Sequence, residues 1–223
     1  VSGRLDYPTV HFEAPPREGL EERLEAFINW FNHSLNDALL DPLLRAGITH
    51  LWFITLHPFD DGNGRITRTL TDLALAQMDE QSIRLYAMSP VILNKRKSYY
   101  EILEQTQKND SNITNWLVWF LDTLNDSLET TLKQIDRTLF KSQFWHKYSN
   151  LDLHEGQRKV LNRLLDGGEN GFEHGISASQ YQKVAKVSKA TATRHLSDLL
   201  EKACIIKLEG GGRNTRYQIN TQL

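Results

Sequence analysis

A turn-rich loop between two apolar helical patterns constrains this chain more than any other stretch of its sequence. The loop reads His-Pro-Phe-Asp-Asp-Gly-Asn-Gly-Arg-Ile-Thr-Arg over residues 57–68. Because Gly and Asn adopt positive φ at little cost, the Asp-Gly-Asn-Gly sequence at 61–64 predicts a tight turn. Apolar residues at helical spacing precede the loop over 42–56 and follow it over 65–79. The sequence therefore predicts two helices with a short loop held between them.

The same loop carries side chains that suit a phosphate-bearing ligand. If a helix begins at Arg65, the amides and the helix dipole at its N-terminus favour a phosphate. Arg65 and Arg68 are three residues apart and share one helix face, where two guanidinium groups suit a di- or triphosphate. Asp61 offers hard oxygen ligands for Mg²⁺, and His57 is of the residue type that most often serves as a general base. Each residue alone fits an ordinary structural role, but the occurrence of all of them in this order within one short loop favours a functional site.

These residues resemble the signature of the Fic (Fic/Doc) family, His-Pro-Phe-x-Asp/Glu-Gly-Asn-Gly-Arg-x-x-Arg, and every fixed position is filled. The likeness extends from about Val1 to about Thr123. Most members of the family transfer AMP from ATP to a hydroxyl side chain of a target protein. The resemblance therefore implies a protein adenylyltransferase with ATP as substrate and Mg²⁺ as cofactor. The loop matches neither a Walker A sequence nor a dinucleotide-binding fingerprint.

Carried over by position, the resemblance assigns a role to each residue of the loop. His57 would deprotonate the Ser, Thr or Tyr hydroxyl of the target, and Phe59 would anchor the loop in the core. Asp61 would hold Mg²⁺ at the α- and β-phosphates of ATP. Arg65 and Arg68 would hold the β- and γ-phosphates. The remaining phosphate contacts are assigned to Asn63 and to the backbone amides of Gly62 and Gly64.

Two further segments are assigned to the nucleotide by the resemblance. Aromatic and β-branched residues over 1–14 predict a short strand or hairpin. In Fic proteins a hairpin at this place, the flap, aligns the target chain by strand addition. In a helix expected over 91–107, a tyrosine pair either packs in the core or offers one ring to adenine. The nucleotide contacts assigned to these segments are Val10, His11, Phe12 and Glu13 in the flap and Tyr99, Tyr100 and Gln107 in the helix.

Other patterns predict the surrounding helices. Apolar spacing over 18–31 indicates an amphipathic helix. Asp41 and Pro42 suit the N-cap and first position of the next helix, which is apolar on most sides and therefore central. His50 in that helix is predicted to be a hydrogen-bonded core histidine. An apolar helical pattern that no Pro or Gly interrupts predicts one long helix over 112–147. This helix is expected to close the first domain and then to continue beyond it as a connector. Its aromatic stripe suits core or dimer contacts.

The composition shifts near Leu151, and three helical patterns followed by a hairpin over 205–219 resemble a winged helix-turn-helix domain. The expected recognition helix, over 189–202, presents Lys189, Thr191, Thr193 and Arg194, and Arg213 and Arg216 flank the expected wing. Residues 151–223 hold eleven Lys and Arg against eight Asp and Glu, a net charge of +3. That mild charge favours protein interaction or dimer contact over DNA binding, although DNA binding stays open.

Composition sets further limits. The formal net charge of −2 carries no global signature of nucleic-acid or membrane binding. Cys204 is the single cysteine, so no internal disulfide forms and a reducing compartment is expected. No apolar run approaches the ~20 residues that span a bilayer. The chain begins at Val1 rather than Met, as a fragment lacking upstream sequence would.

Many Fic proteins carry an inhibitory helix with the motif Ser/Thr-x-x-x-Glu-Gly/Asn. The Glu of this motif pairs with the second arginine of the signature. Glu155-Gly156 comes close, but Leu151 stands where Ser or Thr is required. We therefore expect that this chain by itself is not autoinhibited at Arg68. An upstream segment or a partner would have to supply such a helix.

These inferences define a mainly α fold: a Fic-type helical bundle with a small β-hairpin flap, followed by a winged helix-turn-helix domain. The expected divisions are a catalytic core over 1–125, a helical connector over 126–150 and the winged helix over 151–223. The predicted function is a cytoplasmic protein adenylyltransferase that acts on protein hydroxyl groups, with a homodimer left open and no membrane partner. One alternative is a DNA-binding regulator whose Fic domain only senses nucleotide, against which an intact His57 argues. Another is a Fic enzyme that uses a different donor or removes AMP.

Overall fold

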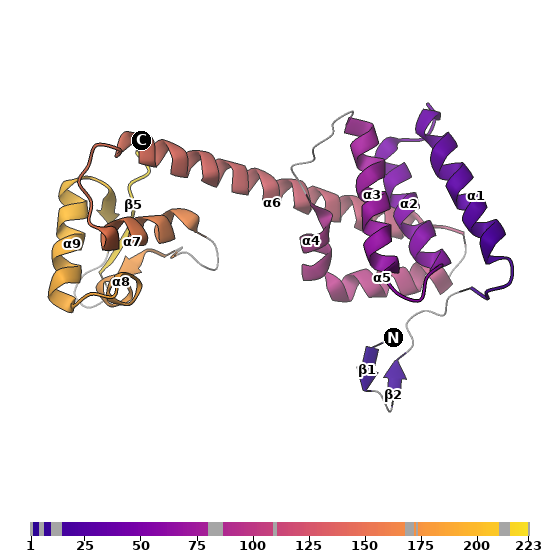
Figure 1. Ribbon diagram of the computed structural model, residues 1–223, viewed down its shortest axis with the longest axis horizontal. Helices are drawn as coiled ribbons and strands as arrows, with labels where there is room; N and C mark the ends of the chain where they lie inside the picture. Colours follow the sequence, from indigo (N-terminus) through magenta and orange to yellow (C-terminus); the bar gives the residue numbers. More distant parts are fainter. Residues whose placement is uncertain are drawn as a thin grey trace. The chain divides into compact units, whose positions relative to one another are not determined.

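The computed structural model describes residues 2–4, 7–9, 15–79, 87–108, 111–167, 172, 174–209 and 215–222, with the backbone alone at 2–4, 7–9 and 79. The chain divides into two compact units, Val1–Thr131 and Leu132–Leu223. Helices dominate both (Figure 1). The prediction of a mainly α fold is therefore confirmed. Each unit has its own buried core and is described by itself.

The first unit is a helical bundle preceded by a two-stranded hairpin. Its elements are β1 Ser2–Arg4, β2 Tyr7–Thr9, α1 Leu20–His33, the 3-10 turn η1 Ser34–Asn36, α2 Pro42–Leu56, α3 Asn63–Asp79, α4 Met88–Asn94, α5 Arg96–Lys108 and the first part of α6 Thr114–Lys147. The helix expected over 91–107 is two helices, because the chain turns at Lys95. The antiparallel hairpin pairs Ser2 with Thr9 and Arg4 with Tyr7, as expected within 1–14. The flap residues assigned to nucleotide, Val10, His11, Phe12 and Glu13, lie outside the described residues.

Helix α2 is the central helix of this bundle. It begins as predicted, with the Asp41 carboxylate accepting the N–H of Leu43 at 2.8 Å and Pro42 in the first turn. Gly47 lets α6 approach closely: the Trp116 indole donates to the Gly47 carbonyl at 2.9 Å. A Cβ at Gly47 would lie 3.0 Å from a side-chain carbon of Leu117. The contact fixes α6 against the helix that leads into the loop.

Helix α6 is continuous over Thr114–Lys147, which confirms the predicted long helix. Trp116, Phe120 and Leu124 are buried in the first core. Phe144 on α6 is buried in the second core. The segment expected as a connector over 126–150 therefore also supplies part of the second unit's core.

The second unit combines helices with a three-stranded antiparallel sheet. Its remaining elements are α7 Glu155–Asp166, β3 Ile176–Ser177, α8 Ala178–Ala185, α9 Lys189–Glu201, β4 Ile205–Lys207 and β5 Arg216–Ile219, with strand order β3-β5-β4. The three helices and the final hairpin follow the predicted order, and Ser177 caps α8. Strand β3 was not expected. Assignment of this unit to the winged-helix class stays a prediction.

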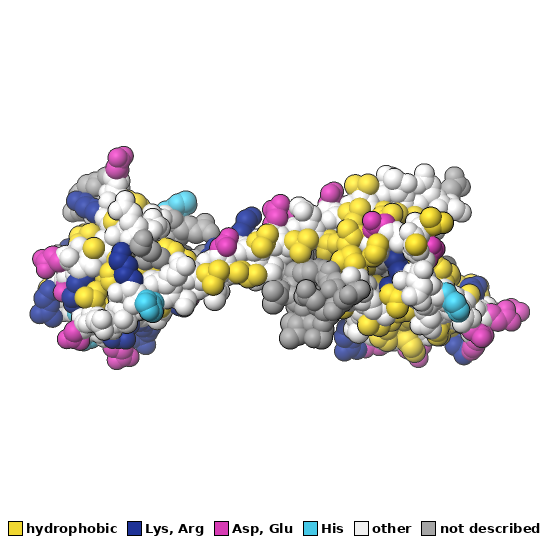
Figure 2. Space-filling model, turned by 90° about the horizontal axis from the view of Figure 1, so that it is seen from above, with side chains coloured by type: hydrophobic (Ala, Val, Ile, Leu, Met, Phe, Trp, Pro, Cys, Tyr) yellow, Lys and Arg dark blue, Asp and Glu magenta, His cyan; other side chains and the backbone are white. Residues whose placement is uncertain are grey.

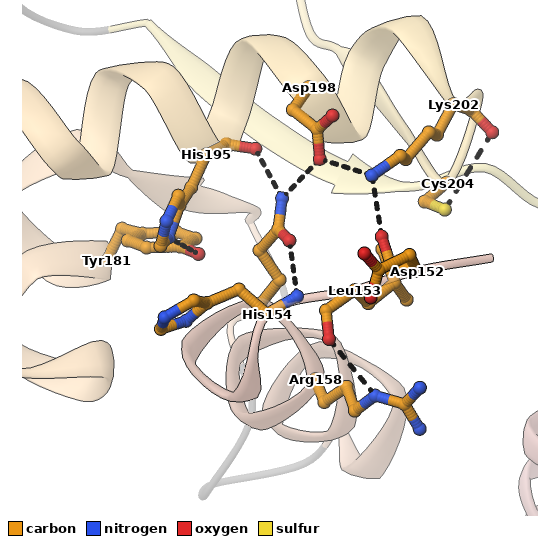
Figure 3. Close-up of polar contacts among 10 residues, drawn as sticks. Asp152, Leu153, His154, Arg158, Tyr181, His195, Asp198, Lys202 and Cys204 are labelled. Atoms are coloured by element: carbon orange, nitrogen blue, oxygen red, sulfur yellow. Dashed lines mark hydrogen bonds and ion pairs between the residues drawn. The ribbon is translucent and has the colours of Figure 1, made fainter.

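A buried polar network ties α7 to α9 (Figure 3). The Gln157 amide donates to the Asp198 carboxylate at 2.6 Å and to the His195 carbonyl at 3.3 Å. Lys202 donates to the same carboxylate at 2.8 Å. The Tyr181 hydroxyl lies 3.0 Å from Nδ1 of His195 (Figure 3). These bonds set the orientation of α9, the helix that also carries the residues predicted to meet a partner.

Acidic and basic side chains are intermixed on the face shown in Figure 2. In the part of the chain that the structure describes, no helix combines the length and apolarity that crossing a bilayer requires. Cys204 is buried, and burial raises the pKa of its thiol to about 11. A thiol with such a pKa stays protonated and unreactive near neutral pH.

Candidate functional site

The loop begins where α2 ends. His57 follows the last helical residue and adopts a left-handed conformation with φ 46° and ψ 53°. Its backbone N–H still donates to the Phe53 carbonyl at 3.2 Å, while its side chain is exposed. Because Pro58 follows and lacks an N–H, the helix does not continue. The imidazole is therefore held at the entrance of the loop with its ring open to a ligand.

Asn63 closes the loop rather than facing a ligand. Its side chain is 3% exposed, and its carboxamide oxygen accepts the N–H of Phe59 at 3.0 Å while its nitrogen donates to the Phe59 carbonyl. Both the oxygen and the nitrogen of the Asn63 amide are thus hydrogen-bonded within the protein. The Phe59 ring packs on Phe53 with centroids 6.5 Å apart and remains 48% exposed. The expectation that Phe59 anchors the loop in the core is wrong, because the Asn63 clamp on its backbone performs that task.

Helix α3 begins at Asn63, two residues before the predicted start. Gly62 delivers the chain into the helix with φ +86°, and its carbonyl accepts the N–H groups of Arg65 and Ile66 at 2.9 and 3.0 Å. Within the described residues, the N–H groups of Gly62, Asn63 and Gly64 find no acceptor. Unpaired amides in a first helical turn, together with the helix dipole, suit an anion.

The two arginines of the signature differ in exposure and in ion pairing. Arg65 pairs with Asp61 at 3.2 Å, and both side chains are largely exposed. Arg68 is partly buried and makes no ion pair with any described residue. A partly buried guanidinium without a carboxylate partner is electrostatically ready to receive an anion. The structure thus distinguishes the two arginines, which the sequence treated alike.

Asp61 fits the role of a Mg²⁺ ligand. Its carboxylate is exposed and offers hard oxygen atoms. The described residues contain no group of three or more His, Cys, Asp and Glu placed to hold a metal. Mg²⁺ commonly binds through one or two carboxylates together with substrate phosphates and water. Asp61 suits such a shared site.

His50 is a satisfied core histidine, as predicted. It is 1% exposed, with Nδ1 3.0 Å from the Thr71 hydroxyl and Nε2 3.0 Å from the Tyr99 hydroxyl. Burial, with the charge of Arg68 as a second cause, lowers the pKa of His50 to about 3. The ring is therefore neutral at physiological pH. Thr71 is a contributor that the sequence reasoning missed, since nothing in an isolated threonine marks it as a histidine partner.

The two tyrosines occupy different environments. Tyr99 is 7% exposed and packs among His50, Trp116 and Trp119, with its hydroxyl on His50. Tyr100 is 43% exposed, and the Arg96 guanidinium carbon lies 5.7 Å from the centroid of its ring. Of the pair, Tyr100 is the ring accessible to a base.

The side chain of Gln107 on α5 contacts the C-terminal end of α2, where the loop begins. Its amide nitrogen donates to the Thr55 hydroxyl at 2.9 Å. Its amide oxygen is buried and has no hydrogen-bond partner among the described residues. Because Thr55 lies two residues before His57, this unpaired acceptor belongs to the helix end that carries the loop.

Comparisons with known proteins match part of the first unit. Residues 4–75 match the Fic/DOC family. The protein named Protein adenylyltransferase Fic from Nematostella vectensis is 34% identical over 98 residues, which cover 43% of this chain and 21% of that protein. Protein adenylyltransferase fic-1 from Caenorhabditis elegans is 33% identical over 114 residues, covering 49% and 21%. The matched region therefore spans about a fifth of these relatives.

Among solved structures, a Fic family protein from Desulfovibrio desulfuricans G20 aligns with 92% of this chain and 56% of its own. The TM-score is 0.47 and the sequence identity is 20%.

Proposed function

We propose that the first unit transfers AMP from ATP to a hydroxyl side chain of a target protein. One observation carries the proposal. The loop after α2 combines an exposed His57, an exposed Asp61, amides at the start of α3 that have no acceptor among the described residues, and an Arg68 that forms no ion pair with those residues. Transfer of a phosphoryl-type group requires positioning and charge stabilisation, and these are the groups that provide both. The names of the curated relatives support adenylyl transfer as the reaction.

In this reaction His57 accepts the proton of the target hydroxyl. The hydroxyl oxygen then attacks the α-phosphorus of ATP, forming a new P–O bond. The bond from the α-phosphorus to the bridging oxygen breaks, and pyrophosphate leaves with the electron pair. The Gly62 and Gly64 amides stabilise charge on the phosphate oxygens, and Arg68 balances charge on the departing pyrophosphate. Mg²⁺, when bound at Asp61, supplies positive charge to the phosphate oxygens.

The remaining residues act by placing the nucleotide and the target. Tyr100 offers its exposed ring to the base. The amide oxygen of Gln107, which has no hydrogen-bond partner among the described residues, offers an acceptor to a base amino group. Asn63 acts indirectly by holding the loop closed. Val10, His11, Phe12 and Glu13 of the flap are proposed to contact the nucleotide, while the flap hairpin aligns the target by strand addition. Arg65 joins the phosphate contacts once its bond to Asp61 is exchanged for one to the nucleotide.

The direct test is label transfer from ATP labelled at the α-phosphate, with Mg²⁺ and with or without cell lysate. We expect protein labelling that falls at least ~100-fold in His57→Ala, because general-base catalysis contributes about 10²–10⁴. His33→Ala is the matched control, since His33 is an exposed histidine on α1. ATP labelled at the γ-phosphate should leave no label on protein. Binding of ATP without transfer would favour the nucleotide-sensing alternative.

The lack of an ion pair between Arg68 and the described residues also supports the proposal that this chain is not autoinhibited there. Among the described residues no glutamate pairs with it. Joining an upstream segment with the Ser/Thr-x-x-x-Glu-Gly/Asn motif should lower the labelling rate. An unchanged rate would contradict the idea.

The charge pattern of α8 and α9 favours a second candidate function, contact with DNA by the second unit. Residues 174–197 contain no Asp or Glu. They carry four exposed cations: Lys183, Lys186, Lys189 and Arg194. The acidic residue that follows, Asp198, is held by Gln157 and Lys202. A run of cations without acids suits a phosphate backbone more than the net charge of the whole unit suggests.

Fluorescence anisotropy with a labelled DNA duplex tests this second function. The double variant Lys189→Glu/Arg194→Glu should weaken binding strongly and reduce the salt dependence of the remaining affinity. Lys159→Glu/Arg163→Glu on α7 makes the same charge change at exposed residues and should have a much smaller effect. Equal losses in both variants, or no binding at low salt, would favour a protein-interaction surface instead.

A further inference from the structure

Two buried threonine hydroxyls form consecutive hydrogen bonds along α3. Thr67 donates to the carbonyl of Asn63 at 2.8 Å, and Thr71 donates to the carbonyl of Thr67 at 2.7 Å. The exposed fractions of the two threonines are 0% and 2%. Bonds from a hydroxyl to the carbonyl four residues earlier slightly destabilise a helix, and valine would fill the same volume without a buried polar atom. The two hydroxyls therefore call for a role beyond helix stability and packing.

The first of these bonds ends at the residue that closes the loop. Asn63 is the first residue of α3, and its side-chain amide holds the N–H and the carbonyl of Phe59. Its backbone carbonyl receives the Thr67 hydroxyl. Thr67 thus fixes the backbone of Asn63 on the helix side, while Asn63 fixes the loop on the other side.

The bond from Thr67 also acts on one of the amides that are proposed to bind phosphate. The Asn63 carbonyl and the Gly64 N–H belong to one planar peptide group, and no peptide bond between described residues is cis. In a trans peptide the C=O and N–H bonds point in opposite directions, so a hydroxyl that fixes the carbonyl also fixes the direction of the N–H. Accepting a second hydrogen bond polarises the peptide group and makes its N–H a stronger donor.

The hydroxyl directions are set from the other end by α2 and α5. Because Thr71 donates its single hydrogen to the Thr67 carbonyl, its oxygen accepts from Nδ1 of His50, 3.0 Å away. Nε2 of the neutral ring then accepts the Tyr99 O–H, also at 3.0 Å. Each hydroxyl hydrogen in this series has its own acceptor, so the turn of α3 that carries Thr67 is held from three helices.

We infer that Thr67 is a positioning residue for the phosphate site: its hydroxyl fixes the Asn63–Gly64 peptide group so that the Gly64 amide points toward the phosphates of the nucleotide. The inference rests on the adenylyl transfer proposed above. It goes beyond the signature, in which position 67 is one of the unspecified residues. Because Thr67 is fully buried, it acts through this peptide group and not by contact with the nucleotide.

Calorimetric titration of the chain with ATP and Mg²⁺ tests this role. Thr67→Val keeps the shape of the side chain and removes the donor. ATP binding should weaken about fivefold, the factor to which the net contribution of one hydrogen bond corresponds. Thr67→Ser keeps the hydroxyl and should retain most of the affinity. Thr49→Val is the matched control, because Thr49 is 0% exposed and donates to the Arg45 carbonyl at 2.8 Å in the middle of α2. It should leave ATP affinity unchanged.

The amide resonance of Gly64, measured by NMR without nucleotide, separates positioning from general destabilisation. It should shift in Thr67→Val, because the peptide group loses a polarising hydrogen bond, and should stay in place in Thr49→Val. If Thr67→Val does not fold, Thr71→Val removes the next bond in the series and should change affinity and resonance in the same direction by a smaller amount.

Three results would overturn the inference: unchanged ATP affinity in Thr67→Val, an equal loss in Thr49→Val, or an equal loss in Thr67→Ser. Failure of the unmodified chain to bind ATP would instead refute the proposed function. In that case the Gly64 resonance would still show whether Thr67 fixes the peptide group, so the two failures are distinguishable.

Discussion

The side chain of Asn63 holds the backbone of Phe59, accepting its N–H at 3.0 Å and donating to its carbonyl. One residue thereby begins α3 and closes the loop that leads into it. The loop between α2 and α3 is consequently fixed before any ligand arrives. Such preorganisation is what a site for charge stabilisation requires.

Replacing Asn63 with Ala should open this loop. Two hydrogen bonds are lost at a buried position, and at about 1 kcal/mol each the first unit should lose about 2 kcal/mol of stability. Urea unfolding followed by tryptophan fluorescence measures this, since Trp30, Trp52, Trp116 and Trp119 lie in the first unit. Asn125→Ala, which removes an exposed amide on α6, should change stability by less than about 0.5 kcal/mol. Equal effects of the two substitutions would show that the clamp is unimportant.

Gly62 and Gly64 should respond differently to alanine. Gly62 has φ +86°, where a Cβ costs about 1–2 kcal/mol, so Gly62→Ala should destabilise the first unit by that amount. Gly64 has ordinary helical geometry, and an added Cβ would lie 3.4 Å from the Arg68 guanidinium, an ordinary contact. Gly64→Ala should therefore be neutral or slightly stabilising in thermal unfolding. The reverse order would contradict the loop geometry.

His50 should make the first unit sensitive to acid. Its folded pKa is about 3, below the unfolded value near 6.5, so the unfolded chain binds an additional proton between these values. The stabilising contribution is fully present above about pH 6.5 and declines as pH falls toward 3, by at most about 1.4 kcal/mol per pH unit. His50→Gln should remove this component of the slope. The measurement is urea unfolding of both chains across that pH range, and parallel profiles would disprove the prediction.

Asp198 should stabilise the second unit through its bonds to Lys202 and Gln157, which lower the pKa of its carboxyl group. Because the folded pKa is depressed, the contribution is present above the unfolded pKa and is lost as pH falls through the folded value. Asp198→Ala should lower the unfolding midpoint of the second unit, reported by hydrogen exchange in α7 and α9. Asp166→Ala, at a more exposed ion pair with Lys141, should have the smaller effect.

The sequence predicted much of the fold because its signals are local. Asp41-Pro42 specified the start of α2, and uninterrupted apolar spacing specified α6. The break between α4 and α5 at Lys95 escaped prediction, since no Pro or Gly marks it. Strand β3 has only two residues, Ile176 and Ser177, and pairs with β5 some forty positions away, so no local pattern reveals it.

By itself the sequence determined the order of chemical groups in the loop, and with it the expectation of a phosphate site bearing a general base. Spacing along the chain also placed Arg65 and Arg68 on one face of a helix. The tertiary structure decided which of these groups face a ligand. It turned Asn63 inward, left Phe59 half-exposed and buried Tyr99 but not Tyr100. Among the described residues it gave Arg65, but not Arg68, a carboxylate partner. These outcomes depend on burial and on contacts between residues distant in sequence, such as His50 with Tyr99, and no linear pattern contains them.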